Sequence, residues 1–205
     1  MLKETFFNLV SKYTDNQYVK NDLWFDIEKR YSTRQRHYHT LDHLKSVLVE
    51  LLPLKKEIDN WDVVLFSLYY HDIIYNFFSS KNELKSAVHA TKQMQELSMS
   101  DENIELCNQH IIATKAHCQT SNSDTNYFTD ADLSILGASW NTYEEYLKNV
   151  RKEYALFPKF MYVKGRKKAL THILGMTRIF KTDYFHSKYE KQARINLRKE
   201  LEQLS

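Results

Sequence analysis

Residues suited to binding a divalent cation occur at several points along the chain. His71 and Asp72 form a His-Asp pair at the end of the apolar segment 63–70, His43 lies upstream, and Asp132 lies downstream. A cation that activates water needs a few imidazole nitrogens and carboxylate oxygens, with one or two coordination positions left open. His43, His71, Asp72 and Asp132 supply such a set, and we expect them to bind one divalent metal ion.

The chemistry of this ligand set narrows the choice of metal without selecting one. Imidazole with carboxylate suits manganese, iron, cobalt, nickel or zinc better than calcium. Magnesium is also retained as a candidate. The sequence therefore predicts a divalent ion of open identity.

Length and composition predict one all-α domain that holds these residues in place. A chain of 205 residues is long enough for one sizeable hydrophobic core and hardly long enough for two. The 3 Gly and 2 Pro fall far below an average usage of about 7% and 5%, so turn chemistry is scarce. We expect residues 1–205 to form a single domain, with a metal-site core over about 20–140 and further helices over about 141–205.

Helical spacing of apolar residues predicts ten helices. They are expected at 2–13, 20–31, 40–53, 61–76, 82–97, 102–117, 130–136, 142–156, 159–180 and 188–203. The expected N-cap residues are Asn60, Asp101, Thr129, Asn141 and Ser187, while Gly137 suits a helix end and Pro158 a first turn. The polar stretch 119–126 is expected to be a loop beside the site.

Composition also excludes several classes of protein. No apolar run approaches the roughly 20 residues of a membrane span, so we expect no membrane segment and a soluble, cytoplasmic protein. Cys107 and Cys118 match neither a zinc nor a redox spacing, which favours buried, reduced thiols.

Charge is unevenly distributed along the chain. Residues 1–137 hold 14 Lys+Arg against 19 Asp+Glu, and residues 138–205 hold 15 against 7. The basic part suits an anionic, phosphorylated substrate. Its densest stretch, 164–168, lacks the interleaved aromatic residues of a single-strand binding surface, so nucleic acid is not the expected partner.

Six short motifs occur along the chain in a fixed order. They are Arg36-His37-Tyr38-His39 with His43, His71-Asp72-Ile73-Ile74-Tyr75, Asn82-Glu83 with Ser86-Ala87, Thr114 with His117, Asp130-Ala131-Asp132-Leu133, and Arg151 with Glu153-Tyr154. In this order the chain resembles the HD superfamily of metal-dependent phosphohydrolases over most of its length. The resemblance implies an all-α HD-domain core whose ligands fall on His43, His71, Asp72 and Asp132. It also implies hydrolysis of a phosphate ester of a small metabolite or nucleotide by metal-activated water.

The same resemblance suggests catalytic roles for two residues besides the ligand Asp72. His39 is the expected general acid, with helix capping or support of a ligand as the alternative. Glu83 is the expected partner of the attacking water or of a substrate hydroxyl. Its alternative is a capping box over 80–83, in which Glu83 bonds back to the helix start.

Three further residues are expected to contact the substrate. Arg36 can present two N–H donors to phosphate oxygens, and an ion pair is its alternative. His117 is expected to bind substrate or orient water, with His110 as packing. Arg151 belongs to the last motif, where an ion pair between helix and core explains it equally well. Asp130 is expected to cap a helix or orient a ligand.

Departures from the superfamily pattern narrow the substrate. Tyr75 and Asn76 stand where guanosine tetraphosphate hydrolases carry a Glu-Asp pair. Tyr75 also replaces the His or Lys of cyclic-nucleotide and cyclic-dinucleotide phosphodiesterases. A different small phosphorylated substrate is therefore expected. Two alternatives are a di-iron oxygenase-type protein, which would need His110 and His117 as ligands, and a non-catalytic metal-binding regulatory module. Assembly as a homo-oligomer stays open.

Overall fold

The computed structural model describes residues 1–204, and over these residues the fold is all helical, with no strand. The prediction of an all-α protein is confirmed. The helices are α1 Leu2–Val10, α2 Gln17–Tyr31, α3 Leu41–Leu51, α4 Trp61–Tyr70, α5 Asn82–Glu96, α6 Asp101–Ala113, α7 Ser123–Asp132, α8 Trp140–Glu153, α9 Lys159–Leu174 and α10 Asp183–Gln203, with short 3₁₀ helices η1 Leu52–Leu54 and η2 Leu133–Gly137.

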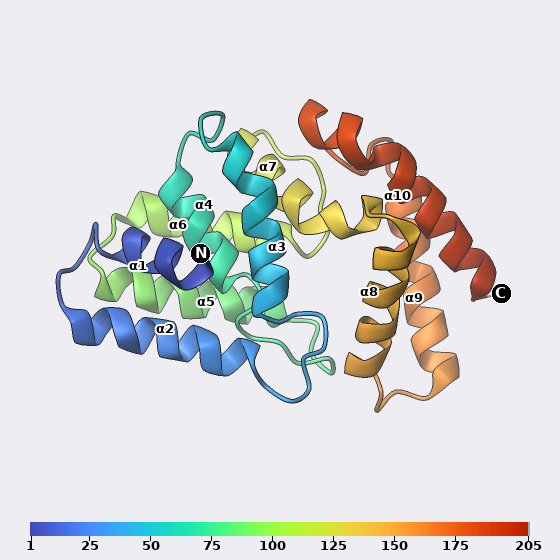
Figure 1. Cartoon of the computed structure of the whole chain (residues 1–205), viewed down its shortest axis with the longest axis horizontal. Helices are drawn as coiled ribbons and strands as arrows, with labels where there is room; N and C mark the ends of the chain where they lie inside the picture. Colours follow the sequence, from blue (N-terminus) through green and yellow to red (C-terminus); the bar gives the residue numbers. More distant parts are fainter. Residues whose placement is uncertain (205) are drawn as a thin grey trace.

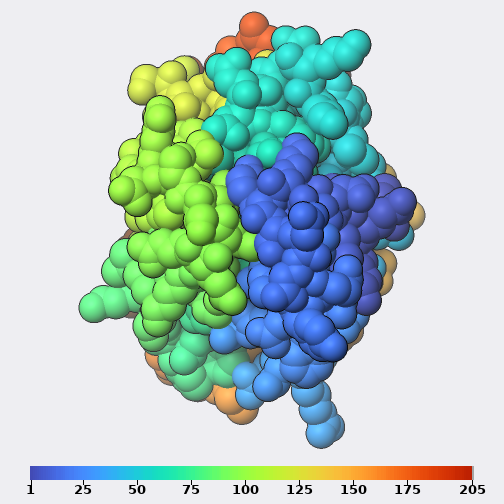
Figure 2. Space-filling view, turned by 90° about the vertical axis from the view of Figure 1, so that its left-hand side faces the viewer, coloured from blue at the N-terminus to red at the C-terminus, as the bar shows by residue number. Residues whose placement is uncertain are grey.

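The helices form two parts that meet along α3, α7 and η2 (Figure 1). Helices α1 to α6 gather at one end, and α8, α9 and α10 stand at the other. Figure 2 shows the surface of the first end, where α1 and α2 lie beside α5 and α6. In the second part α8 and α9 form a hairpin, which α10 joins by packing against α9 and η2.

Helix α4 lies at the centre of the hydrophobic core. All eight residues from Val63 to Tyr70 are buried, and α4 packs against α1, α3, α5, α6 and α7. Such continuous burial explains why this segment reads as an apolar run without polar interruptions. Burying a large apolar side chain contributes about 1.5–3 kcal/mol. The end of α4, where His71 and Asp72 begin, is therefore held firmly.

Most helix starts differ from the predicted ones. Asn60 caps α4 as expected, because its side chain accepts a hydrogen bond from the Val63 amide. The other four predicted N-caps are wrong, because an earlier residue with a short polar side chain caps each helix. They are Asp101, Thr129, Asn141 and Ser187. The observed caps are Ser100 for α6, Asn122 for α7, Ser139 for α8 and Thr182 for α10. Because α7 begins at Ser123, the predicted loop over 119–126 is half helix.

Some other helix ends lie close to their predicted places, and others lie several residues away. Gly137 ends η2, and Pro158 directly precedes α9. Helix α4 stops at Tyr70 rather than at residue 76, and α6 stops at Ala113 rather than at residue 117. Cys118, predicted to be buried, is exposed. Among residues 1–204 no helix is both long enough and apolar enough to cross a bilayer.

Candidate metal centre

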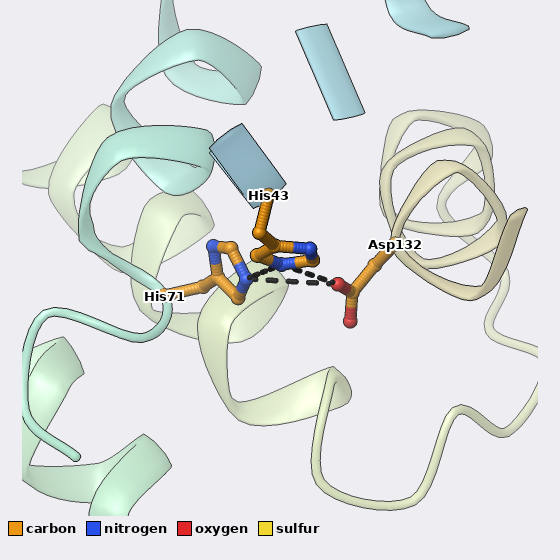
Figure 3. Close-up of side chains that lie close together, drawn as sticks. All are labelled: His43, His71 and Asp132. Atoms are coloured by element: carbon orange, nitrogen blue, oxygen red, sulfur yellow. Dashed lines mark hydrogen bonds and ion pairs between the residues drawn. The ribbon is translucent and has the colours of Figure 1, made fainter. Parts of the chain in front are cut away.

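Three helices bring the predicted ligands together. His43 lies in the first turn of α3, behind the capping residue Thr40, whose hydroxyl accepts from the Asp42 amide. His71 follows the last residue of α4, and Asp132 is the last residue of α7. Figure 3 shows these three side chains pointing toward one another. They are three of the four residues predicted to share one metal ion, and binding of that ion stays a prediction.

Distances among the donor atoms suit a single cation. His43 Nε2 lies 3.2 Å from His71 Nε2 and 3.2 Å from Asp132 Oδ1, and His71 Nε2 lies 3.6 Å from that oxygen. Metal–ligand bonds of about 2.0–2.2 Å place neighbouring donors about 2.8–3.6 Å apart. These three residues form a group able to hold a metal ion.

Asp72 lies at the edge of this group. Its Oδ2 is 3.2 Å from His71 Nε2 and 3.9 Å from His43 Nε2. Asp72 does not belong to the group of three residues whose donor atoms all lie within 4.8 Å of one another. Asp72 is therefore the most loosely placed of the four predicted ligands.

The protonation of His71 is set by its own helix. His71 Nδ1 lies 2.9 Å from the Leu68 carbonyl oxygen. A carbonyl only accepts, so Nδ1 carries hydrogen, and in the neutral ring the Nε2 lone pair faces the site. Because α4 is buried, the ring has one orientation. Ligation by Nε2 requires no rearrangement.

Electrostatics at the site reflect competition between burial and pairing. Burial lowers the pKa of His43 in spite of Asp132. For His71, burial also opposes the charge, but Asp72 and Asp132 outweigh it and raise the pKa well above its usual range. Burial disfavours ionised Asp132, yet hydrogen bonds from His117, His43 and His71 hold its pKa well below that of an ordinary aspartate. The site therefore presents an ionised carboxylate to a cation.

His39 is positioned by a buried carboxylate from the other part of the fold. Glu153, the last residue of α8, has a fully buried side chain, and its Oε2 lies 2.7 Å from His39 Nδ1. Its Oε1 accepts from the backbone amides of residues 37–39 at 2.8–3.0 Å, and the Tyr75 hydroxyl donates to Oε2. Burial opposes ionisation, but these hydrogen bonds lower the pKa of Glu153 to about 2.

This arrangement keeps a proton on His39. Its Nδ1 donates to Glu153, and its Nε2 faces Asp72 Oδ2 at 3.9 Å. Burial is the largest influence and disfavours the imidazolium, but Asp72 and Glu153 together outweigh it and raise the pKa of His39. A histidine with a raised pKa whose Nε2 faces the candidate metal site has the orientation expected of a general acid.

Arg36 binds backbone carbonyl oxygens. Its guanidinium donates to the carbonyl oxygens of His39, Asp72 and Ile73 at 2.7–3.0 Å and stacks on Tyr31 and Tyr75. It is 8% exposed. The same donors predicted to bind phosphate therefore join the segment before α3 to the segment after α4. We assign Arg36 to positioning these two segments.

Arg151 also binds backbone rather than facing the centre. It donates to the carbonyl oxygens of Tyr154 and Phe157 and lies over the Tyr162 ring. These contacts fix the turn between α8 and α9. The predicted ion pair between helix and core is made by Glu153 with His39, and Arg151 takes no part in it.

The remaining predicted residues divide between site and core. His117 Nε2 donates to Asp132 Oδ2 at 2.9 Å, and Glu83 lines the cavity beside the centre. The alternative capping box is absent, since Lys81 is the N-cap of α5 and makes no side-chain cap. His110 is fully buried, with Nδ1 2.8 Å from Thr125 Oγ1, and does not reach the metal centre.

Asp130 faces away from the centre, toward α10. It accepts hydrogen bonds from the amides of Lys181 and Thr182 and from the Thr182 hydroxyl, and its Oδ1 lies 3.0 Å from Lys181 Nζ. Asp130 and Asp132 therefore have different roles. Asp130 binds the start of α10 to α7, and Asp132 faces the candidate cation site.

Comparison of the chain with protein-family models, with curated proteins and with solved structures gives no match. The site must therefore be interpreted from its own geometry and chemistry.

Proposed function

We propose that this protein is a metal-dependent phosphohydrolase of the HD type, acting on a phosphate ester of a small metabolite. The convergence of His43, His71 and Asp132 beside an open cavity is the observation that carries the proposal. These side chains come from three helices, and their donor atoms lie at the spacing of metal ligands. The ordered motifs that resemble the HD superfamily support the same function.

Each residue of the centre has a role in such a reaction. His43, His71 and Asp132 would hold the divalent ion, with Asp72 as the fourth ligand. An ion bound there would activate a water molecule and polarise a phosphoryl oxygen. In hydrolysis the water oxygen bonds to phosphorus, the ester P–O bond breaks, and the leaving oxygen takes up a proton.

His39 is the proton donor in this proposal. Its imidazolium, held through Nδ1 by Glu153, turns Nε2 toward the side of the site where Asp72 lies. His117 and Glu83 border the same space and can orient the water or the substrate. Arg36 and Arg151 have no part in this step, since backbone oxygens occupy their guanidinium groups.

Metal content tests the ligand assignment directly. We expect the purified protein to retain about one divalent ion per chain, and both His43→Ala and Asp132→Ala to lose it, because each removes one of a few ligands. Asp42→Ala is the matched control, since Asp42 adjoins His43 but is exposed and outside the ligand group. Elemental analysis measures the three variants. Equal metal content in all of them would contradict the assignment.

Activity is then tested on a panel of phosphate monoesters and diesters with each candidate metal. We expect hydrolysis by the wild type that is abolished with metal loss in Asp132→Ala and preserved in Asp42→Ala. Retained metal without turnover of any ester would instead favour a non-catalytic metal-binding module.

A further inference from the structure

A cavity of about 550 Å³ opens from the metal centre toward the α8–α9 hairpin. Its inner end is formed by His39, Asp72, His117 and Asp132, and its outer end by side chains of the hairpin and of the loop before α5. This volume suits a small organic ligand. A ligand bound beside Asp132 can extend into this space, while a second cavity of about 480 Å³ borders His43 and Asp132.

The outer end of the cavity is lined by four aromatic residues, which we call the aromatic wall. They are Phe77, Tyr154, Phe157 and Tyr162. Neighbouring rings lie 5.7–6.4 Å apart between centroids, and each of the four is only partly buried. Aromatic rings that pack together and still expose area to a cavity provide stacking surfaces for another flat ring.

Gly165 lies one helical turn after Tyr162 of the aromatic wall and is exposed. It lies in the middle of α9 and lines the cavity, and a Cβ added there would meet nothing within 4 Å. A mid-helix glycine costs about 0.5–1 kcal/mol relative to alanine. Its φ is not positive, so the backbone conformation does not require glycine. Open space in the cavity is the remaining structural consequence of this residue.

Charges in the cavity limit the number of phosphate groups. Among the described residues that line it, the only arginine is Arg166, and there is no lysine. Two of the Arg166 nitrogens bind the Glu200 carboxylate and a third binds the Tyr146 hydroxyl. A polyphosphate needs several free cationic donors. One phosphate at the metal centre is what the cavity can neutralise.

We propose that the substrate is a monophosphate ester whose leaving group carries a flat aromatic ring, stacked on the aromatic wall in the space left by Gly165. This inference rests on the proposed function for the position of the phosphate. The aromatic wall and Gly165 are specificity-determining, because they touch the part of the substrate away from the reacting bond.

The test compares two phosphonates that cannot be hydrolysed. Calorimetry in the presence of Mn²⁺ measures the Kd of 1-naphthylphosphonate and of methylphosphonate for the wild type, Gly165→Phe and Lys164→Phe. Gly165→Phe places a ring in the cavity, whereas Lys164 is exposed on the same helix and does not line it. Circular dichroism and Tm establish that the variants are folded, with Gly165→Ala as the smaller substitution.

We expect the wild type to bind 1-naphthylphosphonate about tenfold more tightly than methylphosphonate, since ring stacking contributes on the order of 1 kcal/mol beyond the area it buries. Gly165→Phe should remove this preference while its Kd for methylphosphonate and its metal content stay unchanged. Lys164→Phe should keep the preference. No preference in the wild type, or a preference that survives in Gly165→Phe, would overturn the inference.

Hydrolysis assays separate this inference from the proposed function. The kcat/KM values for 1-naphthyl phosphate and glycerol 3-phosphate should show the same aromatic preference in the wild type and its loss in Gly165→Phe. A preference in binding without hydrolysis of either ester would sustain the cavity assignment and contradict the hydrolase. Hydrolysis of both esters at equal kcat/KM would do the reverse.

Discussion

Helix α4 and the α8–α9 hairpin differ in what attaches them to the rest of the molecule. In α4 eight consecutive residues are buried, and the contacts are apolar. In α9 only Leu170 is buried. The hairpin combines apolar contacts, such as those of the buried Tyr143 and Val150, with buried polar ones: Glu153 binds the backbone of residues 37–39, and Glu200 of α10 binds Arg166 and the Tyr143 hydroxyl.

This difference separates the two halves of the site. Close apolar packing is stiff, because any displacement opens voids or clashes, so α4 fixes His71 with little freedom. Hydrogen bonds act at a few points and are lost one at a time when a partner is replaced. The metal centre and the cavity wall should therefore respond independently to mutation, and the following experiments test that independence.

The largest effect is expected where a charge pair is buried at the junction of the two parts. Asp130→Ala leaves Lys181 buried without its partner, the two side chains being 0% and 1% exposed. We expect a loss of about 3–5 kcal/mol in the free energy of unfolding. Asp132→Ala, two residues away, should cost much less, because His71 can become neutral and burial already favours the neutral form of His43. Denaturant unfolding in a chelator measures both, and equal losses would contradict the separation of roles.

The free energy of unfolding should depend on pH through His110, a buried residue of α6. Burial lowers its pKa from 6.5 to about 4. Between these two pH values His110 is protonated in the unfolded chain and neutral in the folded chain. Stability is therefore full above pH 6.5 and is lost as the pH falls toward 4. The loss should be roughly 3 kcal/mol over that range.

His110→Asn provides the reference for this measurement, because an amide can still bond Thr125 but does not titrate in this range. Unfolding free energies of both proteins are compared from pH 7 to pH 4. Parallel curves would show that His110 does not titrate as predicted. Glu153, whose pKa is lowered to about 2, contributes stability that is present above its ordinary pKa and is lost only at lower pH.

Glu153→Gln tests the contact between the hairpin and His39, the proposed proton donor. The amide keeps the shape and one acceptor oxygen for the backbone, but it cannot stabilise a positive charge on His39. We expect kcat to fall about 100-fold, the lower range for loss of a general acid, with KM and metal content nearly unchanged. A parallel fall in Tm and metal content would instead show a purely structural role.

The smallest effects concern two glycines in the C-terminal part. A Cβ on Gly137 would lie 2.5 Å from Tyr189 Cβ on α10, so Gly137→Ala should destabilise by about 1–3 kcal/mol. Gly165→Ala meets open space and should stabilise by about 0.5–1 kcal/mol. Thermal unfolding measures both, and shifts of the same sign would contradict the distinction.

The helical fold and the ligand group could be read from the sequence because both leave local signals. Scarce glycine and proline with helical spacing of apolar residues indicate helices, and a His-Asp pair at the end of an apolar run places two polar groups at the edge of a core. Helix starts were less accessible. Several residues with short polar side chains compete for each cap, and tertiary packing selects among them, as with Asn122 over Thr129.

Side-chain partners distant in the chain could not be read in this way. Glu153 belongs to a predicted motif, but its partners are backbone amides 114–116 residues away, and amides carry no sequence signal. The partners of Arg36 could not be predicted from the sequence either. Its type suits phosphate, yet the fold places three carbonyl oxygens around it.

The contact between Glu153 and the loop before α3 has a consequence for synthesis. Tyr75 and its partner Glu153 are separated by 78 residues, which a ribosome adds in about 4–16 s at roughly 5–20 residues per second. Only 21 residues separate Asp132, the last proposed ligand, from Glu153, so for about 1–4 s at the end of that interval the nascent chain contains every proposed ligand without the anchor of His39. The proposed ligands are thus synthesised before Glu153, the last residue of α8, which positions His39.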